Sequence, residues 1–165
     1  MPTHLARDIL CHSDTIAAAL HGDGWLVLPD FLPAQACDAL LTDCQQRRAE
    51  FVAAAVGRGT ARQQLSEQRS DVTLWLRDDA PAQRDFLVAM DRLREEINRR
   101  LFLGLHDYEA HYAYYAPGSF YRRHRDAFAS SQLGSGAPQR ILTSVIYLNT
   151  AAGGELRLWR DEREL

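Results

Sequence analysis

The stretch from Tyr115 to Asp126 reads Tyr-Ala-Pro-Gly-Ser-Phe-Tyr-Arg-Arg-His-Arg-Asp and contains the most informative pattern in the chain. Its Ala-Pro-Gly sequence predicts a turn, and the aromatic residues that follow predict a strand over Phe120–Asp126. Because successive side chains on a strand point to opposite faces, we expect His124 and Asp126 on one face. An imidazole nitrogen and a carboxylate oxygen placed in this way supply two ligands of a 2-His-1-carboxylate iron site.

A His-x-Asp triplet also occurs in settings unrelated to iron. A surface histidine that forms an ion pair with a neighbouring aspartate has the same spacing. The letters His-Arg-Asp are found in the protein-kinase catalytic loop too, but that loop needs asparagine five residues after the aspartate, where this chain has Ser131. The zinc-binding pattern His-Glu-x-x-His does not occur in the sequence. The triplet alone therefore leaves the metal site and the surface ion pair open.

The second half of the chain has the composition of an antiparallel sheet. Short segments rich in aromatic and β-branched residues alternate with turn signals such as Gly-Ser-Gly at 134–136 and Gly-Gly at 153–154. The predicted strands are Tyr108–Tyr115, Phe120–Asp126, Ile141–Leu148 and Glu155–Trp159. A run of strands that follows a run of helices is typical of an α+β protein.

The first half is expected to be mainly helical. Ser13 and Asp14 are good N-cap residues for a helix over Ile16–Leu20, which Gly22 and Gly24 would end. Pro33 suits the first turn of a second helix. A buried stripe at helical spacing supports each of the two longer helices. The stripes are Cys37, Leu40, Leu41, Cys44 and Phe51, then Phe86, Met90, Leu93, Ile97 and Leu101 in the helix that starts at Pro81.

Two apolar segments within this half predict strands, at Trp25–Pro29 and Val72–Leu76. The segment Gly57–Ser70 is rich in Gly, Arg, Gln and Ser, which predicts a loop. The sequence shows no repeat and no linker, so we expect one domain over residues 1–165. Within it, residues 1–105 form the helical scaffold and residues 106–165 the sheet.

Composition narrows the classes of function. The chain has 165 residues, and its formal net charge of −3 gives no drive toward nucleic acid or anionic membranes. Its basic side chains are all arginine, which excludes lysine chemistry such as a Schiff base. The three cysteines form no Cys-x-x-Cys pair, so we expect each of them to be a small buried residue. The N-terminus lacks a secretory pattern, so we expect a cytoplasmic protein.

The motifs together resemble the 2-oxoglutarate/Fe(II) oxygenases, in particular the prolyl 4-hydroxylase-like branch. The similar segments are Asp23–Leu32, the stretch Tyr115–Asp126, Leu142–Asn149 and Gly153–Leu158. This resemblance implies a double-stranded β-helix, or jelly roll, with helices packed on one sheet. It also implies an oxidoreductase of the dioxygenase type that hydroxylates a prolyl, other peptidyl or small-molecule substrate, which would enter over the 57–70 loop.

The resemblance assigns roles to individual residues. His124 and Asp126 match two metal ligands, and Tyr115 and Tyr147 match tyrosines of the 2-oxoglutarate pocket. A dicarboxylate beside a metal needs hydroxyl donors that add no negative charge, which suits both tyrosines. The implied cofactors are Fe(II), the cosubstrate 2-oxoglutarate, and ascorbate as reductant.

The sequence departs from the family pattern after Asp126. The family's third ligand is a histidine that follows, with an Arg or Lys that binds the far carboxylate of 2-oxoglutarate, and no histidine occurs after Asp126 here. We therefore expect a C-terminally truncated chain with an incomplete jelly roll, whose exposed sheet edge favours a homodimer. The alternative is a catalytically inactive remnant that acts at most as a weak metal-binding or interaction module.

Overall fold

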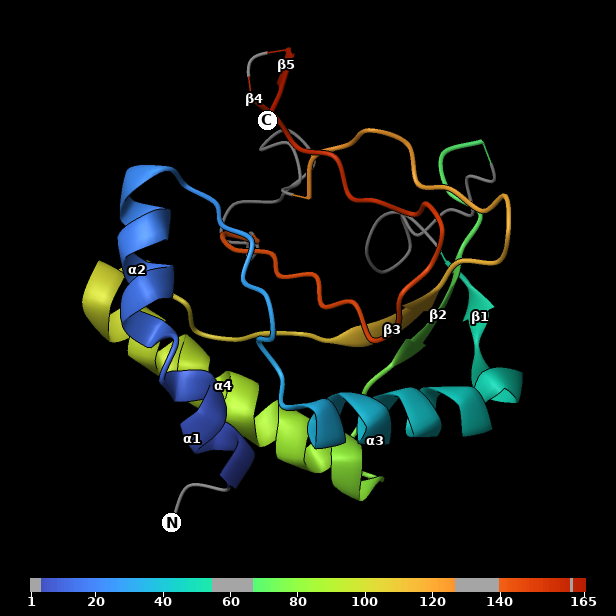
Figure 1. Cartoon of the computed structure of the whole chain (residues 1–165), viewed down its shortest axis with the longest axis horizontal. Helices are drawn as coiled ribbons and strands as arrows, with labels where there is room; N and C mark the ends of the chain where they lie inside the picture. Colours follow the sequence, from blue (N-terminus) through green and yellow to red (C-terminus); the bar gives the residue numbers. More distant parts are fainter. Residues whose placement is uncertain (1–3, 55–66, 127–139, 161) are drawn as a thin grey trace.

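A computed structural model of the chain describes residues 4–54, 67–126, 140–160 and 162–165. Its elements follow one another as in Figure 1. They are α1 (His4–Leu10), α2 (Ser13–Gly22), α3 (Ala34–Gln46), the 3₁₀ turn η1 (Arg48–Glu50), β1 (Val52–Ala53), β2 (Val72–Trp75), α4 (Pro81–Leu101), β3 (His111–Tyr114), β4 (Trp159–Arg160) and β5 (Arg163–Glu164). The mixture of helix and sheet confirms the α+β prediction.

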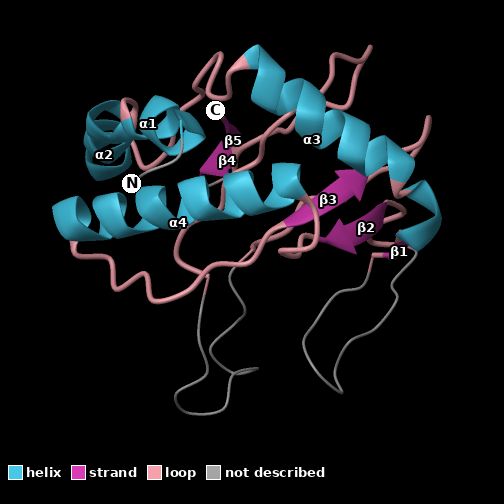
Figure 2. Cartoon of the chain, turned by 90° about the horizontal axis from the view of Figure 1, so that it is seen from below, coloured by secondary structure: helices cyan, strands magenta, loops and turns pink. Residues whose placement is uncertain are grey.

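The long helix α4 organises the core. Pro81 lies in its first turn, where a missing N–H breaks no helical hydrogen bond, and Phe102 ends it in the left-handed conformation with φ of 53°. Its buried stripe includes Phe86, Leu93 and Ile97, as the spacing predicts. Burial of each such side chain contributes about 1.5–3 kcal/mol to stability. The helices α1, α2 and α3 pack against α4 (Figure 2).

The strands β1, β2 and β3 form an antiparallel sheet in that order. Leu74 pairs with Tyr112, and both side chains are buried in the core shared with the helices. Alternation along the strands then places Thr73, Trp75 and His111 on the opposite face. In Figure 1, the C-terminal segments lie on the side of the sheet away from α3 and α4. The sheet therefore has a helix-side face and a far face.

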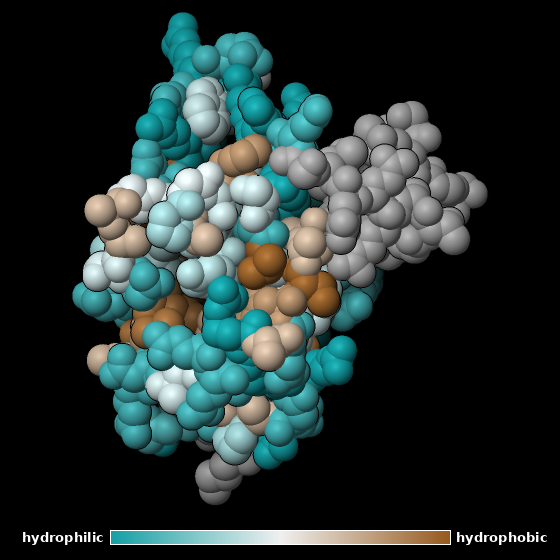
Figure 3. Space-filling model, turned by 90° about the vertical axis from the view of Figure 1, so that its right-hand side faces the viewer, coloured by the Kyte–Doolittle hydropathy of each residue, from teal (hydrophilic) through white to brown (hydrophobic). Residues whose placement is uncertain are grey.

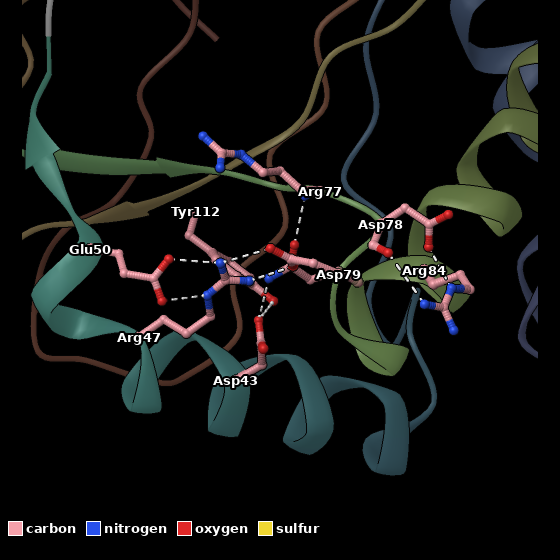
Figure 4. Close-up of polar contacts among 9 residues, drawn as sticks. Asp43, Arg47, Glu50, Arg77, Asp78, Asp79, Arg84 and Tyr112 are labelled. Carbon is pink, nitrogen blue, oxygen red and sulfur yellow. Dashed lines mark hydrogen bonds and ion pairs between the residues drawn. The ribbon is translucent and has the colours of Figure 1, made fainter.

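A polar network joins the helix-side face to α3 and to the start of α4 (Figure 4). The fully buried Gln83 accepts a hydrogen bond from the Arg77 backbone N–H at 2.7 Å and donates one to Asp43 at 2.7 Å. The Tyr112 hydroxyl donates to the same Asp43 oxygen at 2.9 Å. Hydrogen bonding to both partners offsets the cost of burying polar groups, so the network stabilises the scaffold beneath the sheet.

Some predicted elements are confirmed and others are wrong. Two predicted helices are found as α2 and α4, the second helix begins after Pro33, and the predicted strand at 72–76 is β2. Trp25–Pro29 contains no strand, so that prediction was wrong. Helix α1 was not predicted, although Ile9 is fully buried. Among the cysteines, Cys11 is exposed, which corrects its expected burial.

The C-terminal strands are fewer and shorter than predicted. β3 occupies His111–Tyr114 within the predicted strand, whereas Phe120–Asp126 and Ile141–Leu148 contain no regular strand, and Glu155–Trp159 contributes only the start of β4. A strand needs a neighbour that completes its hydrogen-bond ladder. Within the described residues, Tyr121 forms only an isolated bridge to Arg69, and 141–148 joins no ladder.

Apolar side chains remain at the surface of the C-terminal segments. Ile146 and Leu148 pack on the core, but Ile141, Val145 and Tyr147 are exposed. Figure 3 shows apolar patches among hydrophilic residues on one side of the molecule. Exposed apolar surface of this kind is consistent with a partner, and the homodimer stays a prediction. Among the described residues, no helix is both long and apolar enough to span a membrane.

Candidate metal and cosubstrate site

The far face of the sheet gathers polar and aromatic side chains from several segments. The register pairs Val72 with Tyr114, so the next residues outward, Asp71 and Tyr115, are placed opposite each other. At the other end of the two strands, the rings of Trp75 and His111 lie 4.9 Å apart. Partial burial, together with nearby arginines, lowers the pKa of His111.

The His-x-Asp segment reaches this face without forming a regular strand. A turn over Ala116–Ser119 is closed by a hydrogen bond of 2.8 Å, and Gly118 takes its required positive φ of 83°. The structure nevertheless brings His124 and Asp126 together, with 3.1 Å between His124 Nε2 and Asp126 Oδ1. The side chains are 29% and 38% exposed, so small ions and ligands can reach them.

The contact of the other ring nitrogen, Nδ1, shows that Nδ1 carries a hydrogen. Nδ1 lies 2.7 Å from the backbone carbonyl of Arg122, and a carbonyl can only accept, so Nδ1 carries a hydrogen. Nε2 then faces the Asp126 carboxylate either as a protonated donor or as a lone pair. Two lone pairs facing each other at 3.1 Å require a cation between them.

These atoms fit a divalent metal ion. Two ligand bonds of about 2.1 Å at right angles separate the donor atoms by roughly 3.0 Å, close to the observed distance. A metal-binding histidine usually donates its second N–H to a carbonyl or carboxylate, as Nδ1 does here. The same geometry also satisfies the surface ion pair considered from sequence. Among the described residues, no group of three or more His, Cys, Asp or Glu side chains is arranged to hold a metal ion.

Tyr115 lies near Arg69, Asp71 and Tyr121. Burial, followed by the nearby Asp71 carboxylate, raises the pKa of Tyr115 to about 12. Its hydroxyl therefore keeps its proton at neutral pH and can act as a hydrogen-bond donor. This is the property that an adjacent dicarboxylate requires.

Tyr147 is already engaged elsewhere in the protein. Its hydroxyl donates to the Gly154 carbonyl at 3.0 Å and accepts from the Leu156 N–H at 2.9 Å. These bonds clasp the turn at Gly153 and Gly154, where positive φ angles of 80° and 81° favour glycine. The hydroxyl proton is thus committed to the turn in this conformation.

Sequence reasoning missed three residues of this face: Arg69, Asp71 and Tyr121. Arg69 binds Asp71 through two hydrogen bonds of 2.7 and 2.6 Å, and the Asp71 side chain is fully buried. Tyr121 stacks on His124 with ring centroids 3.5 Å apart. A signal was present, because Arg69, Asp71 and the strand residue Thr73 follow the alternating spacing of one sheet face.

Three arginines near the sheet segments have partners elsewhere in the protein. Arg140 binds Glu109, Arg157 binds Glu155, and Arg160 donates to the Asp23 carbonyl. Residues 57–66 of the predicted substrate loop lie outside the described residues, as does the predicted turn at 134–136.

Comparison with known proteins defines the class. Residues 110–165 match the family model of the 2OG-Fe(II) oxygenase superfamily, and this part of the chain belongs to that superfamily. Comparison with solved structures supports the prolyl 4-hydroxylase-like branch for this chain. It is similar to the crystal structure of a Pseudomonas putida prolyl-4-hydroxylase, with 39% sequence identity and a TM-score of 0.63. The match covers 70% of this chain and 61% of that one. No curated protein matched the chain.

Proposed function

We propose that the chain carries the metal and cosubstrate site of an Fe(II)- and 2-oxoglutarate-dependent dioxygenase. His124 and Asp126 would bind the iron, and Tyr115 and Tyr147 would lie beside 2-oxoglutarate. The match of residues 110–165 to the oxygenase superfamily supports this proposal, as does the identity of 39% to a prolyl-4-hydroxylase. The substrate class that we propose is a prolyl or other peptidyl side chain, or a small molecule. The domain would be a jelly roll of which the described sheet forms part.

One observation carries the proposal. The Arg122 carbonyl fixes the hydrogen of His124 on Nδ1 and turns the Nε2 atom toward Asp126 Oδ1 at 3.1 Å. This arrangement presents a nitrogen and an oxygen ligand to the same point. A surface ion pair is compatible with the same two contacts, because a histidinium donates from both nitrogens, so a measurement of metal binding distinguishes the two interpretations.

The residues of the chain would have three roles at this site. His124 and Asp126 hold the metal, the Arg122 carbonyl orients the imidazole, and Tyr115 offers a protonated hydroxyl to the cosubstrate. Iron with 2-oxoglutarate and O₂ would supply the oxidising chemistry, and ascorbate would keep the iron reduced. Two protein ligands leave several metal positions for the cosubstrate and O₂.

A second candidate is a metal-binding or interaction module without catalysis. It is favoured by the described residues, among which no group of three or more His, Cys, Asp or Glu side chains could hold a metal ion. Two protein ligands bind a metal more weakly than three. The two candidates therefore differ in turnover and not in where the metal binds. A cytoplasmic location stays a prediction that rests on the cysteine pattern.

The test measures Fe(II) binding and succinate release from 2-oxoglutarate for the wild-type chain and for His124→Ala. We expect His124→Ala to lower Fe(II) affinity by roughly tenfold or more and to abolish succinate release, because loss of a ligand exceeds the effect of losing a supporting contact. His106→Ala, at an exposed histidine outside the site, is the matched control and should match wild type. Equal affinity in the two variants would contradict the metal site. Metal binding without succinate release would support the second candidate.

A further inference from the structure

The segment just before β2 is tied to the segment just before His124. Ser70 N–H donates to the Phe120 carbonyl at 2.9 Å, and Phe120 N–H donates to the Ser70 hydroxyl at 3.0 Å. Two residues further along, Arg122 N–H donates to the Gln68 carbonyl at 2.9 Å. Residues 67–70 therefore hold the backbone of 120–122, whose last carbonyl orients the His124 ring.

Side chains continue this connection. Arg69 is 11% exposed and is fixed by two hydrogen bonds to the buried Asp71 carboxylate. Its guanidinium carbon lies 4.1 Å from the centroid of the Tyr121 ring. The other contact of Tyr121 is the His124 ring, at 3.5 Å with an interplanar angle of 15°. Four groups thus form a continuous row from Asp71 to His124.

The two contacts of Tyr121 must lie on opposite faces of its ring. An imidazole stacked at 3.5 Å fills one face of the phenol, so the guanidinium at 4.1 Å has room only on the other. The Tyr121 ring is therefore sandwiched between a fixed cation and the candidate ligand. Its position, and with it the plane of the His124 ring, depends on where Arg69 is held.

We propose that Arg69, anchored by Asp71, is a positioning residue that acts through Tyr121 to keep His124 Nε2 directed at Asp126. This inference rests on the proposed function for its relevance to metal binding. Its structural content, the orientation of the His124 ring, can be tested without metal. A planar guanidinium suits this role because it binds a carboxylate through two parallel bonds while its face packs on an aromatic ring.

The chain contains a matched contact that lacks the connection to His124. Arg48 lies 3.5 Å from the centroid of the Tyr114 ring, a cation–π contact of the same kind. Arg48 belongs to the 3₁₀ turn η1, which follows α3, and Tyr114 belongs to β3. If any lost arginine–aromatic contact disturbed the protein in the same way, Arg48→Met would have the same effect as a change at Arg69.

The experiment uses the full 165-residue chain. The main variant combines Arg69→Met with Asp71→Asn, so that neither change leaves a buried charge without its partner. NMR of the His124 ring protons in the metal-free protein reports the stacking on Tyr121, and titration with Co(II) reports the affinity of the site. We expect the ring protons of His124 to shift downfield, toward their positions in the unfolded chain, and Co(II) affinity to fall about 10–100-fold.

A second variant tests the same row at another point. Tyr121→Leu leaves Arg69 and Asp71 paired, and we expect it to shift the His124 signals and to lower Co(II) affinity to a similar extent. Arg48→Met should change neither. Unaltered His124 signals in a folded Arg69→Met/Asp71→Asn variant would overturn the inference. If those signals shift but wild type does not bind Co(II), Arg69 still positions His124 and the proposed metal function is wrong.

Discussion

Each face of the sheet carries an aspartate close to a tyrosine, but the two pairs have different roles. On the helix-side face, Asp43 accepts hydrogen bonds from Gln83 and Tyr112, all within the scaffold. On the far face, Asp71 binds Arg69 and lies near Tyr115. Each aspartate thus neighbours a tyrosine of the same chain segment, because Tyr112 and Tyr115 point to opposite sides of it.

The difference lies in where the polar contacts end. The helix-side network closes on itself, since donors and acceptors of Gln83 and Asp43 meet within the protein. The far-face row ends at His124 and Asp126, two partly exposed groups whose facing atoms suit a cation. A closed network stabilises the fold, whereas an open-ended one can bind a ligand. Substitutions on each face can test this distinction.

The largest effect is expected for Asp71→Ala. Removing this buried carboxylate leaves the Arg69 guanidinium, which is 11% exposed, without its partner, and breaking such a pair costs about 3–5 kcal/mol. The free energy of unfolding, measured by urea denaturation, should fall by this amount. Because Arg69 then no longer supports Tyr121, Co(II) affinity should fall as well.

Asp43→Ala is the corresponding change on the helix-side face. It leaves the donors of Gln83 and Tyr112 unsatisfied, so we expect a loss of about 1–3 kcal/mol. Co(II) affinity of the folded fraction should stay at the wild-type value. If Asp43→Ala weakened metal binding as much as Asp71→Ala did, the two faces would not differ in their connection to the metal site.

The helix-side face was largely predictable from sequence. The stripe Phe86, Leu93 and Ile97 repeats at helical spacing over several turns, and Pro81 marks its start, so α4 follows from local information. The strands over 120–126 and 141–148 were wrong because a strand exists only with a ladder partner. Residue pattern alone does not show whether that partner is there.

The candidate site was predictable in part. His124 and Asp126 were expected on one face of a strand, and their side chains are in contact although no strand forms there. Arg69 was missed because the composition of 57–70 predicted a loop, and Asp71 because it lies between that loop and the predicted strand at 72–76. The role of both depends on contact with Tyr121, about 50 residues away. The orientation of the His124 ring also depends on folding, since residues 67–70 hold the backbone of 120–122, whose Arg122 carbonyl faces Nδ1.

Alkaline pH should also distinguish the two faces. Burial raises the pKa of Tyr112 on the helix-side face, with Asp43 adding to the shift, and the pKa of Tyr115 on the far face to about 12. Between about pH 10 and 12 the unfolded chain loses these phenolic protons while the folded protein keeps them, so the free energy of unfolding falls as pH rises. The slope cannot exceed about 1.4 kcal/mol per pH unit for each tyrosine.

Single substitutions separate the two faces in this experiment. Tyr112→Phe should reduce the fall of the free energy of unfolding with pH most, because Tyr112 is only 5% exposed. Tyr115→Phe should reduce it less, because Tyr115 is 44% exposed and solvent screens its interactions. Denaturation at a series of pH values measures both slopes. An equal or larger change in slope for Tyr115→Phe would show that solvent reaches the far face no more than the helix-side face.

The smallest effect is expected for Tyr147→Phe. It removes the hydrogen bonds to the Gly154 carbonyl and from the Leu156 N–H at an exposed turn, which costs about 1 kcal/mol or less. Hydrogen exchange at the Leu156 amide should accelerate up to about fivefold, since 1 kcal/mol is a factor of about five in an opening equilibrium.

The hydrogen bonds of Tyr147 also bear on its proposed role beside 2-oxoglutarate. A hydroxyl has one proton, so Tyr147 can donate to the cosubstrate only by releasing the Gly154 carbonyl, while its oxygen continues to accept from Leu156. Cosubstrate added to the Co(II)-loaded wild-type chain should therefore leave the Leu156 amide protected. Protection that is lost on adding 2-oxoglutarate would mean that the clasp opens altogether, and Tyr147 would then act by releasing the turn and not by exchanging one acceptor for another.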